Sequence, residues 1–139
     1  MRNILTVCLG NICRSPYAAS VLQHRGSWAV DARSAGLSDK WTGQPAHEEM
    51  LELAAARGFD LAGHRATQVT PELLEWADVV LAMDYKVLDE LRRQADPTVF
   101  GKITFYLDDQ DVPDPYDGTT DDFARAADLI QQGAHRHLP

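Results

Sequence analysis

Residues 8–16, Cys-Leu-Gly-Asn-Ile-Cys-Arg-Ser-Pro, constrain this chain more than any other stretch. An apolar run at residues 4–7 predicts a buried strand directly before them. Ser15 and Pro16 predict the start of a helix, with Ser15 as the N-cap and Pro16 in the first helical position. A short loop from a strand into a helix brings backbone N–H groups and the positive end of the helix dipole together. We therefore expect this loop to bind an oxyanion.

The side chains of the loop suit a reactive thiol. Gly10 and Asn11 are expected to supply the left-handed backbone angles that curl the amides into a nest. Arg14 adds a planar guanidinium that can bind two oxygens at once. Cys8 is expected at the bottom of the nest, where these groups favour the thiolate and the Ser15 hydroxyl can donate to the sulfur. A lone cysteine is more often a small buried packing residue, but the combined pattern favours chemistry.

Composition limits the class of protein. The 139 residues are enough for one domain with its own core, and we expect residues 1–139 to form a single domain. No apolar run approaches the roughly 20 residues needed to span a bilayer, and no signal-peptide pattern is present, so a cytoplasmic location is expected. The net charge of −8 argues against nucleic acid or an anionic membrane as a partner. The two cysteines indicate neither a disulfide framework nor a zinc site, so no metal or cofactor is expected.

Hydrophobic periodicity alternates between strands and helices along the chain. Strands are predicted over residues 4–7, 28–33, 78–83 and 103–107. Helices are predicted over residues 16–24, 46–57 and 71–77. A further helix is predicted after an Asp84 cap, in a region that Pro97 ends, and a last one after a cap at Thr119 or Thr120, reaching Ala134. This alternation predicts an α/β fold, a three-layer sandwich whose four-stranded parallel sheet carries helices on both faces. Ligands of such sheets bind beyond the carboxyl ends of the strands, where Cys8, Ser34 and the loop from Asp108 are expected.

That last loop offers proton donors. Phosphate ester cleavage needs a group that protonates the departing oxygen, and five aspartates are available there: Asp108, Asp109, Asp111, Asp114 and Asp117. Spacing alone does not rank them by geometry. Asp114 is the favoured candidate because the prolines on both sides of it stiffen the backbone, and a proton donor must be held in place. The alternative is an ordinary solvated acidic turn.

Four segments together resemble a known family, the low-molecular-weight protein tyrosine phosphatases, and in particular its bacterial members. These segments are residues 8–16, Ser34-Ala35-Gly36, His64-Arg65-Ala66 and Asp114-Pro115-Tyr116. The resemblance implies the sheet order 2-1-3-4 and a metal-independent hydrolysis of aryl phosphate monoesters through a phosphocysteine. It also implies that Cys8 is the nucleophile, that Arg14 stabilises the phosphoryl group, and that Asp114 is the general acid.

The resemblance further implies a hydrogen-bond network that fixes the loop. The residues at the matching positions are Asn11, Ser15, Ser34 and His64. Taken alone, His64 is better explained as a loop histidine with its hydrogen bonds satisfied, and Ser34 as a strand-end residue.

Substrate preference depends on the walls of the expected pocket. Related arginine phosphatases carry a threonine at the position of Ile12, so the bulkier Ile12 favours an aryl phosphate. The residues expected to contact substrate are Leu9, Gly10, Asn11, Ile12, Cys13, Ser15, Trp41 and Tyr116. The expected partner is a phosphotyrosine protein, and the sequence context of Leu37 and Val112 is closest to bacterial members that act with a tyrosine kinase. Phosphate and vanadate are expected to inhibit.

Three other functions fit the same loop. A protein-arginine phosphatase would use the same nucleophile. An arsenate reductase would need further thiols, and only Cys13 is present. A catalytically silent phosphate-binding module would keep the nest and Arg14 but tolerate the loss of Asp114. Cys13 itself is either a packing residue or a second thiol that traps oxidised Cys8 as a disulfide.

Overall fold

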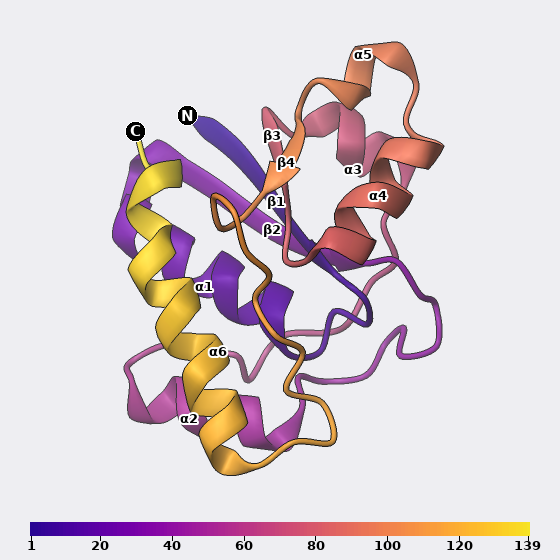
Figure 1. Ribbon diagram of the computed structural model, residues 1–139. Coiled ribbons are helices and arrows are strands. Elements are labelled where there is room, and N and C mark those ends of the chain that lie inside the picture. Colours follow the sequence, from indigo (N-terminus) through magenta and orange to yellow (C-terminus); the bar gives the residue numbers. More distant parts are fainter.

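Four parallel strands form the centre of the structure, a computed structural model that describes residues 1–139. They are β1 (Arg2–Cys8), β2 (Val30–Gly36), β3 (Val79–Ala82) and β4 (Ile103–Phe105). Their order is β2-β1-β3-β4, as Figure 1 shows, and the register places Cys8 opposite Gly36. The predicted α/β class, parallel sheet and strand order are confirmed.

Helices cover both faces of the sheet because strand residues alternate between two cores (Figure 1). Ile4 and Leu81 point to the face covered by α1 (Arg14–Gly26), α2 (Glu48–Ala56) and α6 (Thr120–Gly133). Leu5 and Val80 point to the other face, covered by α3 (Pro71–Trp76), α4 (Tyr85–Gln94) and α5 (Pro97–Phe100). Two short 3₁₀ helices, η1 (Ser27–Ala29) and η2 (Ala134–His137), complete the fold.

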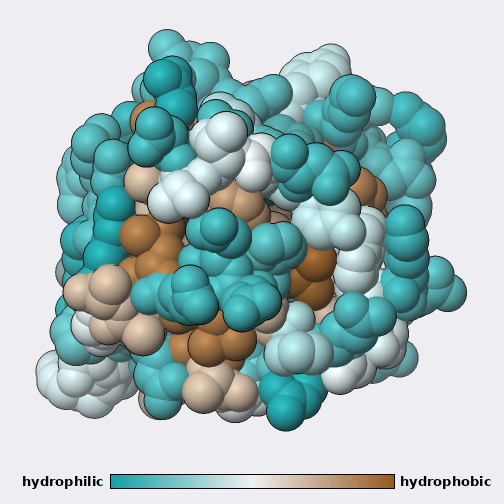
Figure 2. Space-filling model, turned by 90° about the horizontal axis from the view of Figure 1, so that it is seen from below, coloured by the Kyte–Doolittle hydropathy of each residue, from teal (hydrophilic) through white to brown (hydrophobic).

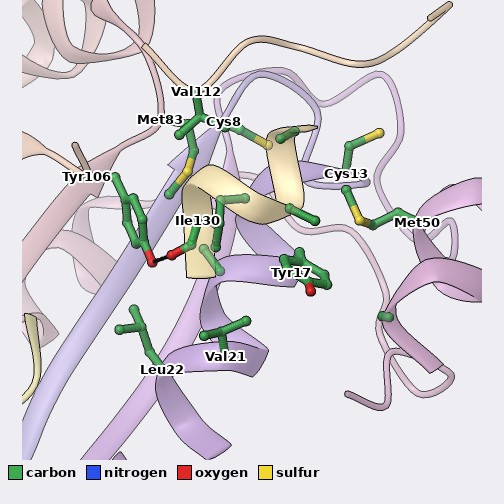
Figure 3. Packing of buried hydrophobic residues seen from close by; sticks show 14 of the residues in the cluster. Cys8, Cys13, Tyr17, Val21, Leu22, Met50, Met83, Tyr106, Val112 and Ile130 are labelled. Carbon is green, nitrogen blue, oxygen red and sulfur yellow. Dashed lines mark hydrogen bonds between the residues drawn. The ribbon is translucent and has the colours of Figure 1, made fainter. Parts of the chain in front are cut away.

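Tyr106 ties the end of the sheet to the last helix. Its side chain is fully buried, and its hydroxyl donates to the Ile130 carbonyl of α6 at 2.6 Å, the dashed line in Figure 3. Cys13 and Met50 belong to the same buried cluster, which joins the start of α1 to α2. This core fixes α6 and α2 around the carboxyl end of β1. None of the helices is long and apolar enough to cross a membrane.

The start of α1 differs from the prediction. The helix begins at Arg14, with Cys13 in the N-cap position and no side-chain cap. Ser15 is therefore not the N-cap, and Pro16 is not the first helical residue. The physical reason is that the Ser15 hydroxyl is used elsewhere, in contacts with Cys8 and Asn11, and is not free to accept a helix N–H.

The ends of several other helices and strands also differ from the prediction. Strand β2 begins at Val30 because residues 27–29 form η1, and β4 ends at Phe105. Helix α2 begins at Glu48 because the His47 ring accepts the Glu49 N–H at 3.1 Å. Pro97 was predicted to end the region of the helix that follows Asp84. It instead begins a further helix, α5, whose N-cap is Asp96. The predicted Asp84 cap is confirmed, and of the two candidate threonines Thr119 is the cap.

Candidate active site

Cys8 ends β1 at the base of a tightly curled loop. The side chain is 3 % exposed. The Asn11 backbone N–H donates to its sulfur at 3.3 Å, and the Ser15 hydroxyl lies 3.0 Å from it. The curl depends on Asn11, whose φ of 60° lies in the left-handed region, as expected for an asparagine. The loop thus brings the Asn11 N–H and the Ser15 hydroxyl into contact with the sulfur.

Gly10 is needed for a different reason from the one predicted. Its backbone is not left-handed. A Cβ atom at this position would instead lie 2.6 Å from the Trp41 ring, so glycine allows the indole to pack on the loop. Gly36 allows a second close approach, because a Cβ there would lie 2.9 Å from the Leu9 carbonyl oxygen. Both glycines let the wall and floor of the site contact the loop backbone directly.

The Arg14 guanidinium is held by hydrogen bonds at one nitrogen and has no partner at another. Its Nη1 donates to Asp84 at 2.7 Å and to the Val112 carbonyl at 2.9 Å. Its Nε has no hydrogen-bond partner, although the side chain is only 2 % exposed, and its Nη2 lies 3.6 Å from Asp114. Burial alone would lower the pKa of Arg14, but Cys8 and the two carboxylates raise it above its ordinary value. The guanidinium is therefore a permanent, oriented cation.

The four residues of the expected network are brought together. The Asn11 side-chain amide donates to the hydroxyls of Ser15 at 2.8 Å and Ser34 at 2.9 Å. Its oxygen accepts the Thr67 N–H at 2.9 Å. The His64 Nε2 lies 2.7 Å from the Asn11 carbonyl oxygen and must carry the hydrogen there. Burial lowers the pKa of His64, with the Asn11 hydrogen bond opposing this effect, so the ring is neutral at pH 7. Ser34 lies within β2 and not at its end.

A small pocket of about 50 Å³ opens above the sulfur. Trp41 and Tyr116 form its aromatic walls, with ring centroids 5.8 Å apart in an edge-to-face arrangement. Asp114 lines the same pocket, and its Oδ1 accepts the Tyr116 N–H at 3.1 Å while the side chain stays 43 % exposed. The remaining lining residues are Cys8, Leu9, Gly10, Ile12, Cys13 and Arg14. The pocket has room for a phosphoryl group and little more.

Sequence reasoning missed two partners of Arg14. Asp84 was predicted only as a helix cap, yet its carboxylate has two roles. Its Oδ1 accepts the Val87 N–H at 2.9 Å and caps the helix, while its Oδ2 accepts a hydrogen bond from Arg14. An available signal was its place directly after β3, at the sheet edge where Cys8 lies. The Val112 carbonyl carried no signal, because any residue presents one.

Cys13 is buried in the wall of the loop. Its side chain is 4 % exposed, and burial, reinforced by Cys8 and Asp114, raises its pKa far above the ordinary value. Cys13 is therefore a thiol at neutral pH. Both cysteines are free in this structure, and the role of Cys13 as a redox partner of Cys8 stays a prediction. No three His, Cys, Asp or Glu side chains come together in a way that could hold a metal ion.

The fold and the site define a class: an α/β protein with a cysteine at the base of an oxyanion loop, at the carboxyl edge of a parallel sheet. Residues 3–138 match the family model described as low molecular weight phosphotyrosine protein phosphatase. The chain belongs to this family.

Similar proteins agree with this assignment. The chain is 35 % identical over 142 residues to the probable low molecular weight protein-tyrosine-phosphatase EpsP of Ralstonia nicotianae, covering all of this chain and 95 % of that one. The structure of Vibrio vulnificus Wzb in complex with benzylphosphonate superposes with a TM-score of 0.90 at 33 % identity, over 97 % and 95 % of the two chains. The YwlE arginine phosphatase from Geobacillus stearothermophilus is also similar, with a TM-score of 0.89, 29 % identity, and 98 % and 90 % coverage.

We predict that Asp84→Asn destabilises the fold. Asparagine keeps an oxygen for the Val87 N–H but removes the closer of the two carboxylates that face the buried Arg14 charge, so the free energy of unfolding should fall by about 3 kcal/mol. Urea denaturation measures the change. The matched control is Asp111→Asn, since Asp111 accepts the Tyr85 N–H at the start of the same helix and makes no contact with Arg14. Equal midpoints for the two variants would contradict the role of the ion pair.

We also predict a pH dependence of stability that His64 helps to set. Because its pKa in the folded protein lies below the ordinary value of 6.5, the unfolded chain binds more protons as the pH falls. The free energy of unfolding should therefore decrease as the pH drops through 6.5 toward the lower folded-state pKa. His64→Gln should reduce this decrease between pH 8 and 5.5, and urea titrations at several pH values measure it. His135→Gln, at an exposed ring, is the control, and an unchanged slope in His64→Gln would refute the prediction.

Proposed function

We propose that this protein hydrolyses phosphotyrosine in proteins through a phosphocysteine formed on Cys8. One observation supports this most directly. Cys8, Arg14 and Asp114 line one small pocket, and the buried Nε of Arg14 has no hydrogen-bond partner within the protein. This supports the proposal, because phosphoryl transfer to a thiolate requires a nucleophile, an oxyanion donor and an acid close together.

The proposed first step moves the phosphoryl group to sulfur. The Cys8 thiolate attacks the phosphorus atom, the P–O bond to the tyrosine oxygen breaks, and protonated Asp114 gives its proton to that oxygen. Arg14 and the loop N–H groups hold the equatorial oxygens, whose charge they stabilise. Asp114 is suited to this task because its Asx-type bond to the Tyr116 N–H orients it while its side chain stays partly exposed.

The second step returns the enzyme to its starting state. Asp114, now a carboxylate, accepts a proton from a water molecule as that water attacks phosphorus. The S–P bond breaks, inorganic phosphate leaves, and the Cys8 thiolate is regenerated. The Ser15 hydroxyl, 3.0 Å from the sulfur, supports the departing thiolate by hydrogen bonding. Since inorganic phosphate is the product of this site, phosphate and vanadate should compete with substrate.

Phosphotyrosine is favoured over phosphoarginine by the walls of the pocket. Ile12 is apolar and 7 % exposed, and Trp41 and Tyr116 stand edge to face beside it, so a flat aromatic ring finds apolar contacts. The similar fold of an arginine phosphatase does not decide the substrate, because the backbone is shared. We infer that a protein phosphorylated on tyrosine is the partner, a bacterial tyrosine kinase being the first candidate.

The free thiols fit a reducing compartment, so we place the protein in the cytoplasm.

We predict that Cys8→Ser abolishes hydrolysis of a phosphotyrosine peptide, since a hydroxyl is a far weaker nucleophile than a thiolate. The variant should still bind inorganic phosphate by calorimetry, because Arg14 and the loop amides remain. For the wild type, orthovanadate should inhibit and EDTA should have no effect. Faster release of phosphate from a phosphoarginine peptide would favour the arginine phosphatase, and arsenate-dependent consumption of an added thiol would favour the reductase. Activity that needs an added metal would contradict the proposal.

We predict that Asp114→Asn slows the enzyme according to the leaving group. For phenyl phosphate, whose phenolate needs a proton, kcat/KM should fall by about 10²- to 10⁴-fold. For para-nitrophenyl phosphate the loss should be much smaller, because that phenolate leaves without help. Equal losses for both substrates would remove Asp114 from the acid role, and a wild type without turnover would indicate a silent phosphate-binding module.

A further inference from the structure

A second hollow adjoins the phosphate pocket. It has a volume of about 580 Å³ and shares Ile12, Trp41 and Tyr116 with that pocket, so the two spaces have a common wall. It lies between the starts of α2 and α6, which lie close together at the bottom of Figure 1. The Thr120 hydroxyl, 3.5 Å from Glu49, spans the gap between the two helices. We call this hollow the flanking groove.

Apolar and aromatic groups line the inner part of the flanking groove. The His47 ring stacks on Phe123 with a centroid distance of 4.9 Å and meets Tyr116 edge-on at 5.7 Å. Ala46 and Phe123 are buried beneath it. The face seen from below in Figure 2 shows hydrophobic areas among hydrophilic ones, as expected for a surface that combines an apolar floor with a polar rim.

The rim of the flanking groove is acidic. Glu48, Glu49 and Asp117 line it, and no lysine or arginine does. None of the three carboxylates forms a salt bridge, so their charge is not neutralised within the protein. Lys40 lies over the Trp41 ring at 4.9 Å but does not line the groove. A positively charged group in the groove would therefore meet uncompensated negative charge.

We propose that the flanking groove binds the polypeptide next to phosphotyrosine and selects substrates with lysine or arginine there. This inference rests on the proposed function, because it names the class of substrate for the same site. The phosphate pocket has room for little more than the phosphoryl group, so the ring and the peptide backbone attached to it must pass the aromatic walls shared with the groove. An acidic segment would be repelled by Glu48, Glu49 and Asp117, whereas a basic segment would be attracted.

The expected size of the effect follows from the exposure of the carboxylates. Glu48 and Asp117 are exposed and Glu49 is half-buried, so each contact with a basic side chain is weak and screened by salt. Together the three should give about a three- to tenfold preference in kcat/KM at low ionic strength. The preference should shrink in 0.5 M salt, while a preference based on shape would persist.

The test compares three phosphotyrosine peptides that differ only in the residues on both sides of the phosphotyrosine: lysine, glycine or glutamate. For the wild type, kcat/KM should fall in that order. In the variant Glu48→Gln/Glu49→Gln/Asp117→Asn, the ratio of the lysine peptide to the glutamate peptide should approach one. Because the ratio is taken within one variant, a general loss of activity cancels. Asp117→Asn alone, which keeps a residue tolerant of the left-handed φ of 68°, should reduce the ratio partly and serves if the triple variant fails to fold.

The matched control removes the same charge elsewhere. Glu72→Gln/Glu75→Gln/Asp60→Asn changes three exposed carboxylates outside both hollows, and its lysine-to-glutamate ratio should equal that of the wild type. Equal rates for the three peptides, or a preference that survives in the triple groove variant, would overturn the inference while leaving the phosphatase proposal intact. Hydrolysis of para-nitrophenyl phosphate but of none of the peptides would overturn the proposed function and this inference together.

Discussion

The site depends above all on the conformation of Asn11. Its backbone takes the left-handed angles that turn the loop, its N–H reaches the Cys8 sulfur, and its carbonyl accepts from His64. The side chain meanwhile binds two serine hydroxyls and the Thr67 N–H. A strained backbone angle persists only where the surroundings hold it, and here five hydrogen bonds from separate parts of the chain do so. The nest is therefore preorganised before any anion arrives, so little free energy is spent on ordering it.

The second constraint is that the hydrogen-bond donors of Arg14 are only partly paired within the protein. A buried guanidinium is costly unless it is paired, and Asp84 with the Val112 carbonyl supplies that pairing on one side. If all its donors were satisfied by the protein, the cation would be inert toward a ligand. The unpartnered Nε shows that the pairing is incomplete. The side chain to which we assign stabilisation of the phosphoryl oxygens is thus also anchored in the fold, and the anchoring fixes its orientation.

The parts of this protein that the sequence predicts are those set by local spacing. The loop from Cys8 to Arg14 can be predicted because its amides, its cysteine and its arginine lie within a few residues of one another. Hydrophobic periodicity likewise predicts the strands and helices from which the sheet is built. Contacts between distant segments are not readable in this way. Asp84 looks like any N-cap until the fold brings β3 beside β1, and the need for Gly10 appears only when Trp41 packs on it. Ser15 was misassigned for the same reason, since its hydroxyl serves residues outside its own helix.

A protein with a net charge of −8 must attract a phosphate dianion against its own field. It can do so because the attraction is local: Arg14 and the loop amides act at contact distance in a buried pocket, whereas most carboxylates lie on the solvated surface and are screened within about 10 Å. The uneven placement of these carboxylates then matters more than their number. In the inference drawn above, the carboxylates beside the pocket act on the polypeptide attached to the phosphoryl group and not on that group itself. The same charge that would weaken a simple phosphate-binding protein can therefore sort phosphorylated polypeptides by the residues around the modified side chain.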